Sequence, residues 1–180
     1  MDPSLVRASK FLSLVLRHRP EHIGITLDPA GWVSVDELLA AARRSGFPLD
    51  RATLERVVAG NDKRRFAFSD DGARIRASQG HSVGVDLGLA AQAPPEVLFH
   101  GTATRFLDSI RREGLRPGSR THVHLSADEA TAHTVGRRHG SPVVLRVNAG
   151  DMHRDGHELV LAENGVWLAR EVPARYLAFP

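Results

Sequence analysis

Ten residues without hydrophobic periodicity, LGLAAQAPPE at 87–96, divide this chain of 180 residues into two parts. The segment contains Pro94 and Pro95, which neither a helix interior nor a central strand accommodates. The sequence before it is typical of helices followed by a hairpin, and the sequence after it of mixed strands and helices. We therefore expect two small domains, residues 1–90 and residues 91–180, in an α+β fold.

The first part carries strong helix-start signals. Asp2 precedes Pro3, Ser34 opens the capping box S-V-D-E, and Asp50 precedes a third apolar-periodic segment. The first of these helices is expected to end within LRHRP, residues 16–20. FAFSDDGARIRA, residues 66–77, alternates around an Asp-Gly turn and predicts a hairpin. Three helices and a hairpin suggest a winged-helix module, a class that usually binds nucleic acid but often binds only protein.

The second part predicts short strands separated by helices. VLFHGT is expected to be a strand that ends in a glycine turn, residues 104–113 an amphipathic helix closed by Gly114, and HVHLS a short strand. Ser126 with Glu129 has the spacing of another capping box. PVVLRV is expected to be a buried strand, and ELVLA and GVWLA to form a hairpin around Glu163 and Asn164.

Composition excludes several classes of protein. The chain has no cysteine, so it has no disulfide, thiolate nucleophile or cysteine metal site. No apolar run approaches the ~20 residues that span a bilayer, and no signal peptide is recognisable, so a cytoplasmic location is expected. The net charge is only +3. Of 24 basic residues only Lys10 and Lys63 are lysines. Arginine favours bidentate phosphate recognition, although a GC-rich genome would also explain the excess.

Three stretches of the first part suit phosphate binding. LRHRP at 16–20 and NDKRRF at 61–66 concentrate cations, and a hairpin would bring the second beside IRASQGHSV at 75–83. Alone, LRHRP is better explained by cations at a helix C-terminus, and NDKRRF by a solvated basic turn. The meeting of NDKRRF with IRASQGHSV across a hairpin is the more specific signal.

Two stretches of the second part suit a ligand site. FHGT at 99–102 follows a strand, and its glycine would let the backbone approach a ligand closely. His122 and His124 of SRTHVHLS share one strand face and could form a three-histidine zinc site with His100, but no cysteine or carboxylate ligand accompanies them. No P-loop, GxGxxG, HExxH or GxSxG motif is present.

The chain resembles the KptA family of RNA 2'-phosphotransferases over nearly its whole length. The stretches that carry the resemblance, in the family's order and spacing, are LSLVLRHRPE, GWVSVDELL, NDKRRFAFSDDGARIRASQGHS, LFHGT, SRTHVHLS, VGRRHGSPVVLRV and NGVWLA. The resemblance implies a winged-helix-like RNA-binding lobe over residues 1–90 and an NAD-binding lobe of ADP-ribosyltransferase type over residues 91–180.

The resemblance also implies the reaction. An internal 2'-phosphate of RNA attacks C1'' of the nicotinamide ribose of NAD+ and expels nicotinamide. The 2''-hydroxyl of this ADP-ribosylated RNA then attacks the phosphate. RNA with a 2'-hydroxyl leaves together with ADP-ribose 1'',2''-cyclic phosphate. No metal is expected, because arginine can supply the positive charge.

Site residues follow from the matching motifs. The family's arginine–histidine–arginine–arginine catalytic set maps onto Arg17, His18, Arg65 and Arg120. The NAD-binding set maps onto His100, Gly101, Thr102, His124, Leu125, Ser126 and Val166. The RNA phosphate set comprises Lys63, Arg76, Gln79, Gly80, His81 and Ser82. Arg64 is an alternative to Arg65, and Arg76 is alternatively a brace for the hairpin.

Two other functions are compatible with the sequence. The chain could be an NAD-dependent ADP-ribosyltransferase that caps terminal phosphates of RNA or DNA and stops after the first step. It could also be a non-catalytic winged-helix RNA-binding protein. Val166 stands where protein-modifying relatives place a catalytic glutamate, which counts against protein ADP-ribosylation, although Glu163 is near in sequence. We expect a monomer whose partners are NAD+ and an RNA that carries a 2'-phosphate.

Overall fold

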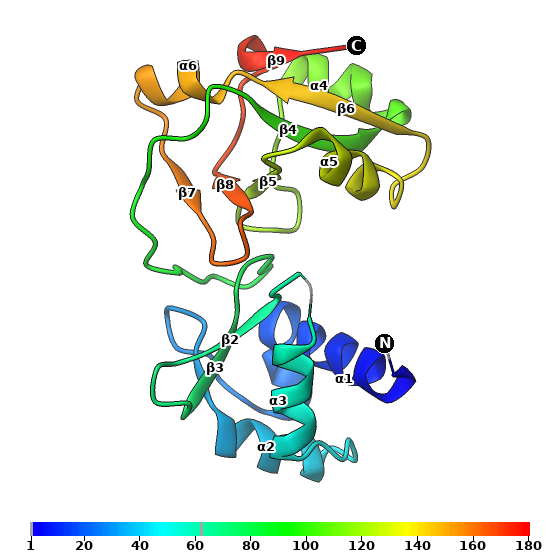
Figure 1. Cartoon of the computed structure of the whole chain (residues 1–180), viewed down its shortest axis with the longest axis vertical. Helices are drawn as coiled ribbons and strands as arrows, with labels where there is room; N and C mark the ends of the chain where they lie inside the picture. Colours follow the sequence, from blue (N-terminus) through cyan, green and yellow to red (C-terminus); the bar gives the residue numbers. More distant parts are fainter. Residues whose placement is uncertain (1, 62) are drawn as a thin grey trace. The chain divides into compact units, whose positions relative to one another are not determined.

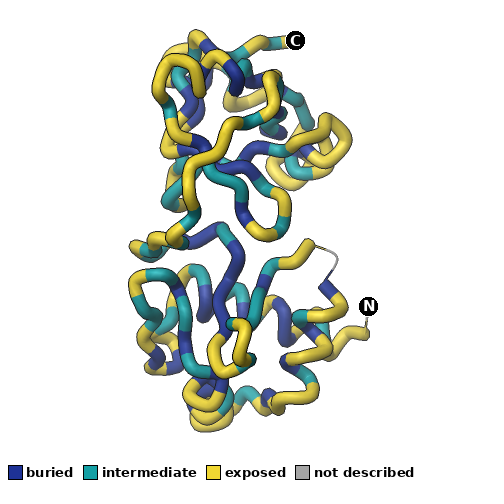
Figure 2. Tube along the Cα trace, turned by 60° about the vertical axis from the view of Figure 1, so that its left-hand side comes forward, coloured by how far each residue is buried: buried dark blue, intermediate teal, exposed yellow. Residues whose placement is uncertain are grey.

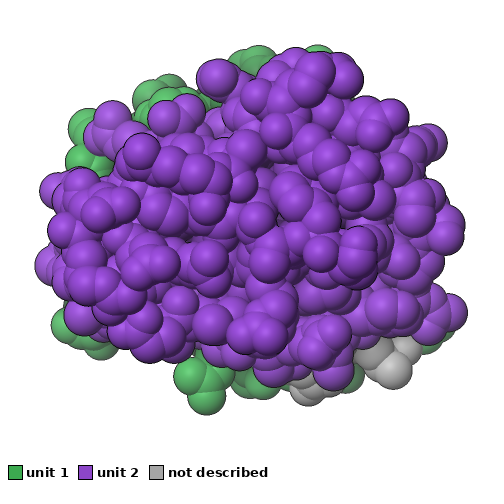
Figure 3. Space-filling view, turned by 90° about the horizontal axis from the view of Figure 1, so that it is seen from above, with its two compact units in different colours: residues 1–88 green, residues 89–180 purple. Residues whose placement is uncertain are grey.

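The computed structural model describes residues 2–61 and 63–180. It divides into two compact units, Met1–Gly88 and Leu89–Pro180, which Figure 3 colours separately. Each unit has its own buried apolar cluster. Short helices and three small antiparallel sheets make up the two units, which confirms the expected α+β class. Among the described residues no helix is long and apolar enough to cross a membrane.

Unit 1 begins with helices whose caps the sequence predicted. The helices are α1 (Pro3–Ser13), a π-helical turn (Leu14–His18), a 3-10 turn (Pro20–Ile23), α2 (Val35–Arg44) and α3 (Arg51–Ala59). The side chains of Asp2, Ser34 and Asp50 each accept a hydrogen bond from a backbone amide of the first turn, as expected of N-caps. The apolar faces of these helices pack on one another and on the sheet of this unit.

The sheet of unit 1 contains the predicted hairpin. Strands β1 (Val33–Ser34), β2 (Phe66–Phe68) and β3 (Arg74–Ala77) pair antiparallel in the order β1-β3-β2 (Figure 1). Gly72 has φ 69° in the hairpin turn, a conformation that favours glycine. Burial continues past the end of β3, where Ser78, Gly80 and His81 are buried and Gln79 is half-buried. Figure 2 colours the chain by burial. The segment after the hairpin is therefore packed against its unit.

Unit 2 contains two three-stranded antiparallel sheets. One has the order β4-β6-β9, with β4 (Leu98–Ala103), β6 (Pro142–Val147) and β9 (Leu177–Ala178). The other has the order β5-β8-β7, with β5 (Val123–Leu125), β7 (Leu159–Leu161) and β8 (Trp167–Ala169). The helices are α4 (Leu107–Glu113), α5 (Glu129–Gly136) and α6 (Ala149–Arg154), with 3-10 turns at Thr104–Phe106 and Ala174–Tyr176.

Two strand predictions in unit 2 need correction. The β6 segment was expected to be buried throughout, but Arg146 is exposed between the buried Leu145 and Val147. This alternation is normal for an antiparallel strand with one solvated face. The β4 segment was expected to end in a turn at Gly101, but Gly101 lies inside the strand and pairs with Val144.

Close packing between β4 and α5 explains why position 101 is a glycine. A Cβ added to Gly101 would overlap the carbonyl oxygen of Ala132 and lie 2.8 Å from the backbone nitrogen of Gly136. Both groups belong to the backbone of α5, which lies beside β4 in Figure 1. The missing side chain thus leaves room for a helix, where we expected the close approach of a ligand.

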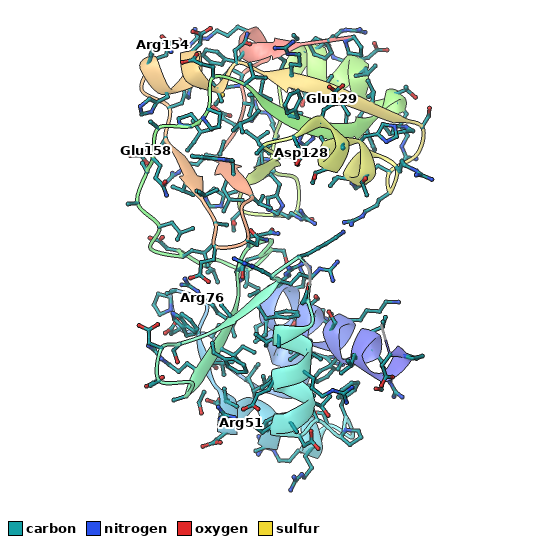
Figure 4. All side chains as sticks on the ribbon, in the orientation of Figure 1. Arg51, Arg76, Asp128, Glu129, Arg154 and Glu158 are labelled. Carbon is teal, nitrogen blue, oxygen red and sulfur yellow. The ribbon has the colours of Figure 1, made fainter. Side chains whose placement is uncertain are left out.

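The N-cap of α5 also differs from the prediction. Asp128, labelled at the start of this helix in Figure 4, accepts a hydrogen bond from the backbone amide of Thr131 at 2.7 Å. Ser126, the predicted cap, instead exchanges two backbone hydrogen bonds with Phe99 of β4. An aspartate and a serine are equally good caps, so spacing alone misplaced the start of the helix by two residues.

We expect Gly101→Ala to destabilise unit 2 severely. The new methyl group would overlap backbone atoms of α5, which can yield only by moving the helix, so a loss of about 3 kcal/mol or more is expected. Denaturant unfolding measures this loss. The matched control is Gly84→Ala, which adds a methyl group in open space. Equal stability of the two variants would contradict the packing explanation.

Candidate active site

The loop 78–82, which follows β3, connects to the first predicted catalytic stretch through Ser82. The backbone amide of Ser82 donates to the carbonyl of Arg17 at 2.9 Å. The hydroxyl of Ser82 lies 2.9 Å from Nδ1 of His18. One residue of the loop therefore fixes both the backbone and the imidazole of the Arg17–His18 pair.

Arg17 and His18 belong to the π-helical turn at the end of α1. The sequence predicted a simple helix end here, and the π-helical geometry is a difference. π-Helical turns are rare and often occur at functional sites, because the extra residue re-aims the side chains around it. The guanidinium carbon of Arg17 lies 5.9 Å from the ring centroid of Phe66. Gly80 has φ 88° and lies against the same guanidinium. A Cβ added to Gly80 would be 3.5 Å from the guanidinium carbon of Arg17.

The other end of the loop connects to the second predicted catalytic stretch through Ser78. The backbone amide of Ser78 donates to the carbonyl of Arg65 at 2.8 Å. Its hydroxyl donates to the carbonyl of Arg64 at 2.7 Å. Unit 1 therefore brings the Arg17–His18 pair and Arg65 to one loop. The hairpin predicted this position for the NDKRRF stretch, whereas it did not predict that Arg17 and His18 would join it. Ser78 itself was missed, because a serine just after a strand carries no motif of its own.

Two expected phosphate contacts of unit 1 are buried. Arg76 is 7% exposed, stacks 4.4 Å above the ring centroid of Trp32 and donates to the carbonyls of Ala30 and Leu87. Figure 4 labels this side chain on β3. His81 is only 2% exposed. The contacts of Arg76 match its alternative role as a brace of the hairpin, because they engage protein carbonyls and an aromatic face.

Two further residues of the predicted phosphate set are Gln79, within loop 78–82, and Lys63, just before Arg64. The side-chain oxygen of Gln79 is buried and has no hydrogen-bond partner among the described residues. An amide oxygen only accepts, so it suits a hydroxyl or amino donor better than a phosphate oxygen. The backbone amide of Lys63 donates to the side chain of Asn61 at 3.1 Å, which holds the start of the RRF segment.

In unit 2 the predicted NAD-binding histidine is held by the neighbouring strand. Nδ1 of His100, on β4, lies 3.0 Å from the carbonyl oxygen of His124, on β5. A carbonyl oxygen only accepts, so Nδ1 of His100 carries the proton and Nε2 is an acceptor in the neutral ring. Burial lowers the pKa of His100, and nearby His139 lowers it further, against the opposing effect of the hydrogen bond. His100 is therefore neutral at physiological pH.

The predicted catalytic arginine of unit 2 has a histidine partner. Nη1 of Arg120 lies 2.7 Å from Nδ1 of His124. Arginine only donates, so Nδ1 of His124 accepts and its neutral ring is protonated on Nε2. Partial burial, and secondarily the charge of Arg138, lower the pKa of Arg120, which still leaves it charged at neutral pH. His100 and His124 thus have opposite tautomers.

The remaining predicted residues of unit 2 lie on or beside strands of its two sheets. Thr102 and Leu125 are buried on β4 and β5, and the backbone of Ser126 bonds to β4. Val166 lies in the β7–β8 turn, where its amide donates to the side chain of Asn164 at 3.3 Å. Across residues 2–61 and 63–180, no group of three His, Cys, Asp or Glu side chains could hold a metal ion. The described residues therefore contain no three-histidine cluster of the zinc type.

We expect acid to destabilise the protein through His100. The unfolded chain takes up this proton near pH 6.5, but the lowered pKa delays uptake in the folded state. The free energy of unfolding therefore falls as the pH drops below about 6.5, by at most about 1.4 kcal/mol per pH unit. Unfolding by denaturant at a series of pH values measures this slope.

His100→Gln should flatten that slope in the range above the carboxylate titrations. The control is His133→Gln, which changes an exposed histidine of α5 in the same unit. It should retain the full fall. A slope that is the same in His100→Gln and wild type would contradict the assignment.

Comparisons with known proteins identify the family of the chain. The family described as "RNA 2'-phosphotransferase, Tpt1 / KptA family" matches residues 3–171. A curated relative from Agrobacterium fabrum, named "Probable RNA 2'-phosphotransferase", is 63% identical over 169 residues, which is 94% of this chain and 91% of the relative. A relative of the same name from Burkholderia lata is 60% identical, over 97% of this chain and 91% of the relative. Another from Streptomyces coelicolor is 58% identical, over 97% of this chain and 95% of the relative. The chain therefore belongs to the Tpt1/KptA family of RNA 2'-phosphotransferases.

Proposed function

We propose that this protein removes an internal 2'-phosphate from RNA by transferring it to NAD+. The products are RNA with a 2'-hydroxyl, nicotinamide and ADP-ribose 1'',2''-cyclic phosphate, by way of an ADP-ribosylated RNA 2'-phosphate. Family membership supports the RNA 2'-phosphotransferase activity. The observation that carries the proposal is the loop 78–82, which holds Arg17, His18 and Arg65 within one unit.

The chemistry of these three residues suits a phosphomonoester. Such a group carries about −1.5 to −2 charges at pH 7 and presents three acceptor oxygens. Two guanidinium groups can each donate two hydrogen bonds to it, and their position is set by backbone hydrogen bonds from Ser78 and Ser82. Fixed cations of this kind stabilise charge that develops at phosphorus without reorganisation during the reaction.

His18 is the proposed proton donor of the second step. Ser82 engages Nδ1, so we assign the exchange of a proton with the substrate to Nε2. The proton goes to the 2'-oxygen of the RNA as it leaves phosphorus. Histidine suits this role because its unperturbed pKa is close to neutral pH.

The side chains of unit 2 fit NAD+ as the co-substrate. Nε2 of His100 is an acceptor in its neutral tautomer, and a ribose hydroxyl is a matching donor. Bound NAD+ would supply the ribose carbon that receives the phosphate and the nicotinamide that leaves. Arg120, which His124 orients, is proposed as the third phosphate-binding arginine on the basis of the family motif.

The architecture supports the two proposed lobe types. Three helices and the β1-β3-β2 sheet support a winged-helix-like RNA-binding lobe in unit 1. The paired three-stranded sheets of unit 2 support an ADP-ribosyltransferase-like lobe.

Turnover with a defined RNA tests the proposal. The protein is mixed with NAD+ and an RNA that carries one internal 2'-phosphate, and nicotinamide and the phosphorus NMR spectrum are followed. We expect nicotinamide release and a cyclic phosphate signal in equal amounts. Nicotinamide release that leaves a stable ADP-ribosylated phosphate would indicate the capping activity instead. RNA binding without nicotinamide release would indicate a non-catalytic RNA-binding protein.

Arg65→Ala and Arg120→Ala should each abolish most of the turnover while leaving the fold intact. Loss of one preorganised charged donor to the transition state typically costs about 10²–10³ in rate. Steady-state kinetics with thermal unfolding as a folding check measure the effect. The control is Arg43→Ala, which changes an exposed arginine at the end of α2. Activity of either variant at the control's level would refute its catalytic role.

A further inference from the structure

Arg64 has an unusual backbone conformation next to the proposed catalytic Arg65. Its φ is 42°, and within residues 2–61 and 63–180 no other non-glycine residue has a positive φ. The left-handed region is unfavourable for residues with a Cβ, so a non-glycine residue adopts it only where its surroundings hold it there. Such residues concentrate at functional sites.

Two buried residues hold Arg64 in this conformation. The amide of Arg64 donates to the carbonyl of Asn61 at 2.8 Å. The carbonyl of Arg64 accepts from the hydroxyl of Ser78 at 2.7 Å. Ser78 is 4% exposed and Asn61 is 6% exposed, so neither bond is readily replaced by water. The hydroxyl of Ser78 is thus the side-chain contact that fixes the peptide between Arg64 and Arg65.

The orientation of that peptide sets the backbone position of Arg65. The carbonyl of Arg65 accepts from the amide of Ser78 at 2.8 Å, and β2 starts at the next residue, Phe66. The carbonyl of Arg65 is bonded to the loop, and the left-handed Arg64 precedes it. The side chain of Arg65 therefore points in one direction from the backbone. Release of Arg64 to an ordinary conformation would rotate the shared peptide and shift the Arg65 side chain.

We propose that Ser78 is a positioning residue that acts through the strained backbone of Arg64 to aim Arg65 at the substrate phosphate. The inference rests on the proposed function for its catalytic consequence. It assigns to Arg64 a role through its backbone, and the phosphate contact to Arg65. It also distinguishes the two adjacent arginines. The carbonyl of Arg65 accepts from the amide of Ser78, whereas that of Arg64 accepts from its hydroxyl.

A double-mutant cycle between Ser78→Ala and Arg64→Gly tests the proposal. Ser78→Ala should lower kcat about tenfold, because the strain at Arg64 is no longer opposed. Glycine adopts a positive φ without strain. In the Arg64→Gly background the same serine substitution should therefore cost no more than about twofold. A tenfold loss in both backgrounds would overturn the proposal, since the serine would then act by another route.

Two companion variants separate positioning from a general loss of stability. Ser78→Thr retains the hydroxyl and should recover most of kcat. Ser109→Ala removes a hydroxyl that bonds the carbonyl of Phe106 at 2.9 Å in unit 2, and should leave kcat unchanged. If Ser109→Ala lowers kcat as Ser78→Ala does, or if Ser78→Thr does not recover it, the positioning role is refuted.

A backbone measurement keeps this inference distinct from the proposed function. The intraresidue amide-to-Hα NOE of Arg64 is strong when φ is positive. We expect it to be strong in the wild-type protein and to weaken in Ser78→Ala. An unchanged NOE in Ser78→Ala would overturn the hold of Ser78 on Arg64. Absence of turnover in the wild-type protein would instead refute the proposed function, and the NOE would still decide the structural link.

Discussion

Two serines at the ends of the loop 78–82 determine how unit 1 presents its charged residues. Ser82 holds the π-helical turn with Arg17 and His18, and Ser78 holds the backbone of Arg65. Both serines bond backbone carbonyls, which places the loop and the two cationic stretches in one rigid set. Mutual repulsion would otherwise separate neighbouring cations, so the arrangement depends on these hydrogen bonds. The glycine between the serines allows the loop to lie against the Arg17 guanidinium.

Side-chain contacts between β4 and β5 have the corresponding role in unit 2. The carbonyl of His124 fixes the tautomer of His100, and the side chain of His124 accepts from Arg120. The carbonyl of His124 thus makes Nε2 of His100 an acceptor, and Arg120 makes Nε2 of His124 a donor. Both rings are neutral. Gly101 permits α5 to pack directly on β4, which buries this edge of the sheet. The lowered pKa of His100 follows first from the burial of its own side chain.

Local patterns in the sequence were enough to predict the helices of unit 1 and both hairpins. Caps such as Asp50 and turns such as Asp71–Gly72 act over a few residues, and the structure confirms them. The meeting of the NDKRRF stretch with loop 78–82 also followed, because a hairpin brings its flanks together. Predictions failed where the cause lies in distant packing. Gly101 faces a helix about thirty residues later in the chain, and nothing in FHGT indicates it. The left-handed Arg64 and the π-helical turn both form hydrogen bonds with loop 78–82, a distant contact that no local pattern reveals.

The central claim is that the residues held by loop 78–82 bind the RNA 2'-phosphate. The most direct measurement compares, without NAD+, the affinity for an RNA with one internal 2'-phosphate and for the same RNA with a 2'-hydroxyl. We expect the phosphorylated RNA to bind at least about tenfold more tightly, because charge-assisted hydrogen bonds contribute about 1.4 kcal/mol or more. We also expect Arg65→Ala to remove most of this difference. Equal affinity of the wild-type protein for the two RNAs would contradict the account.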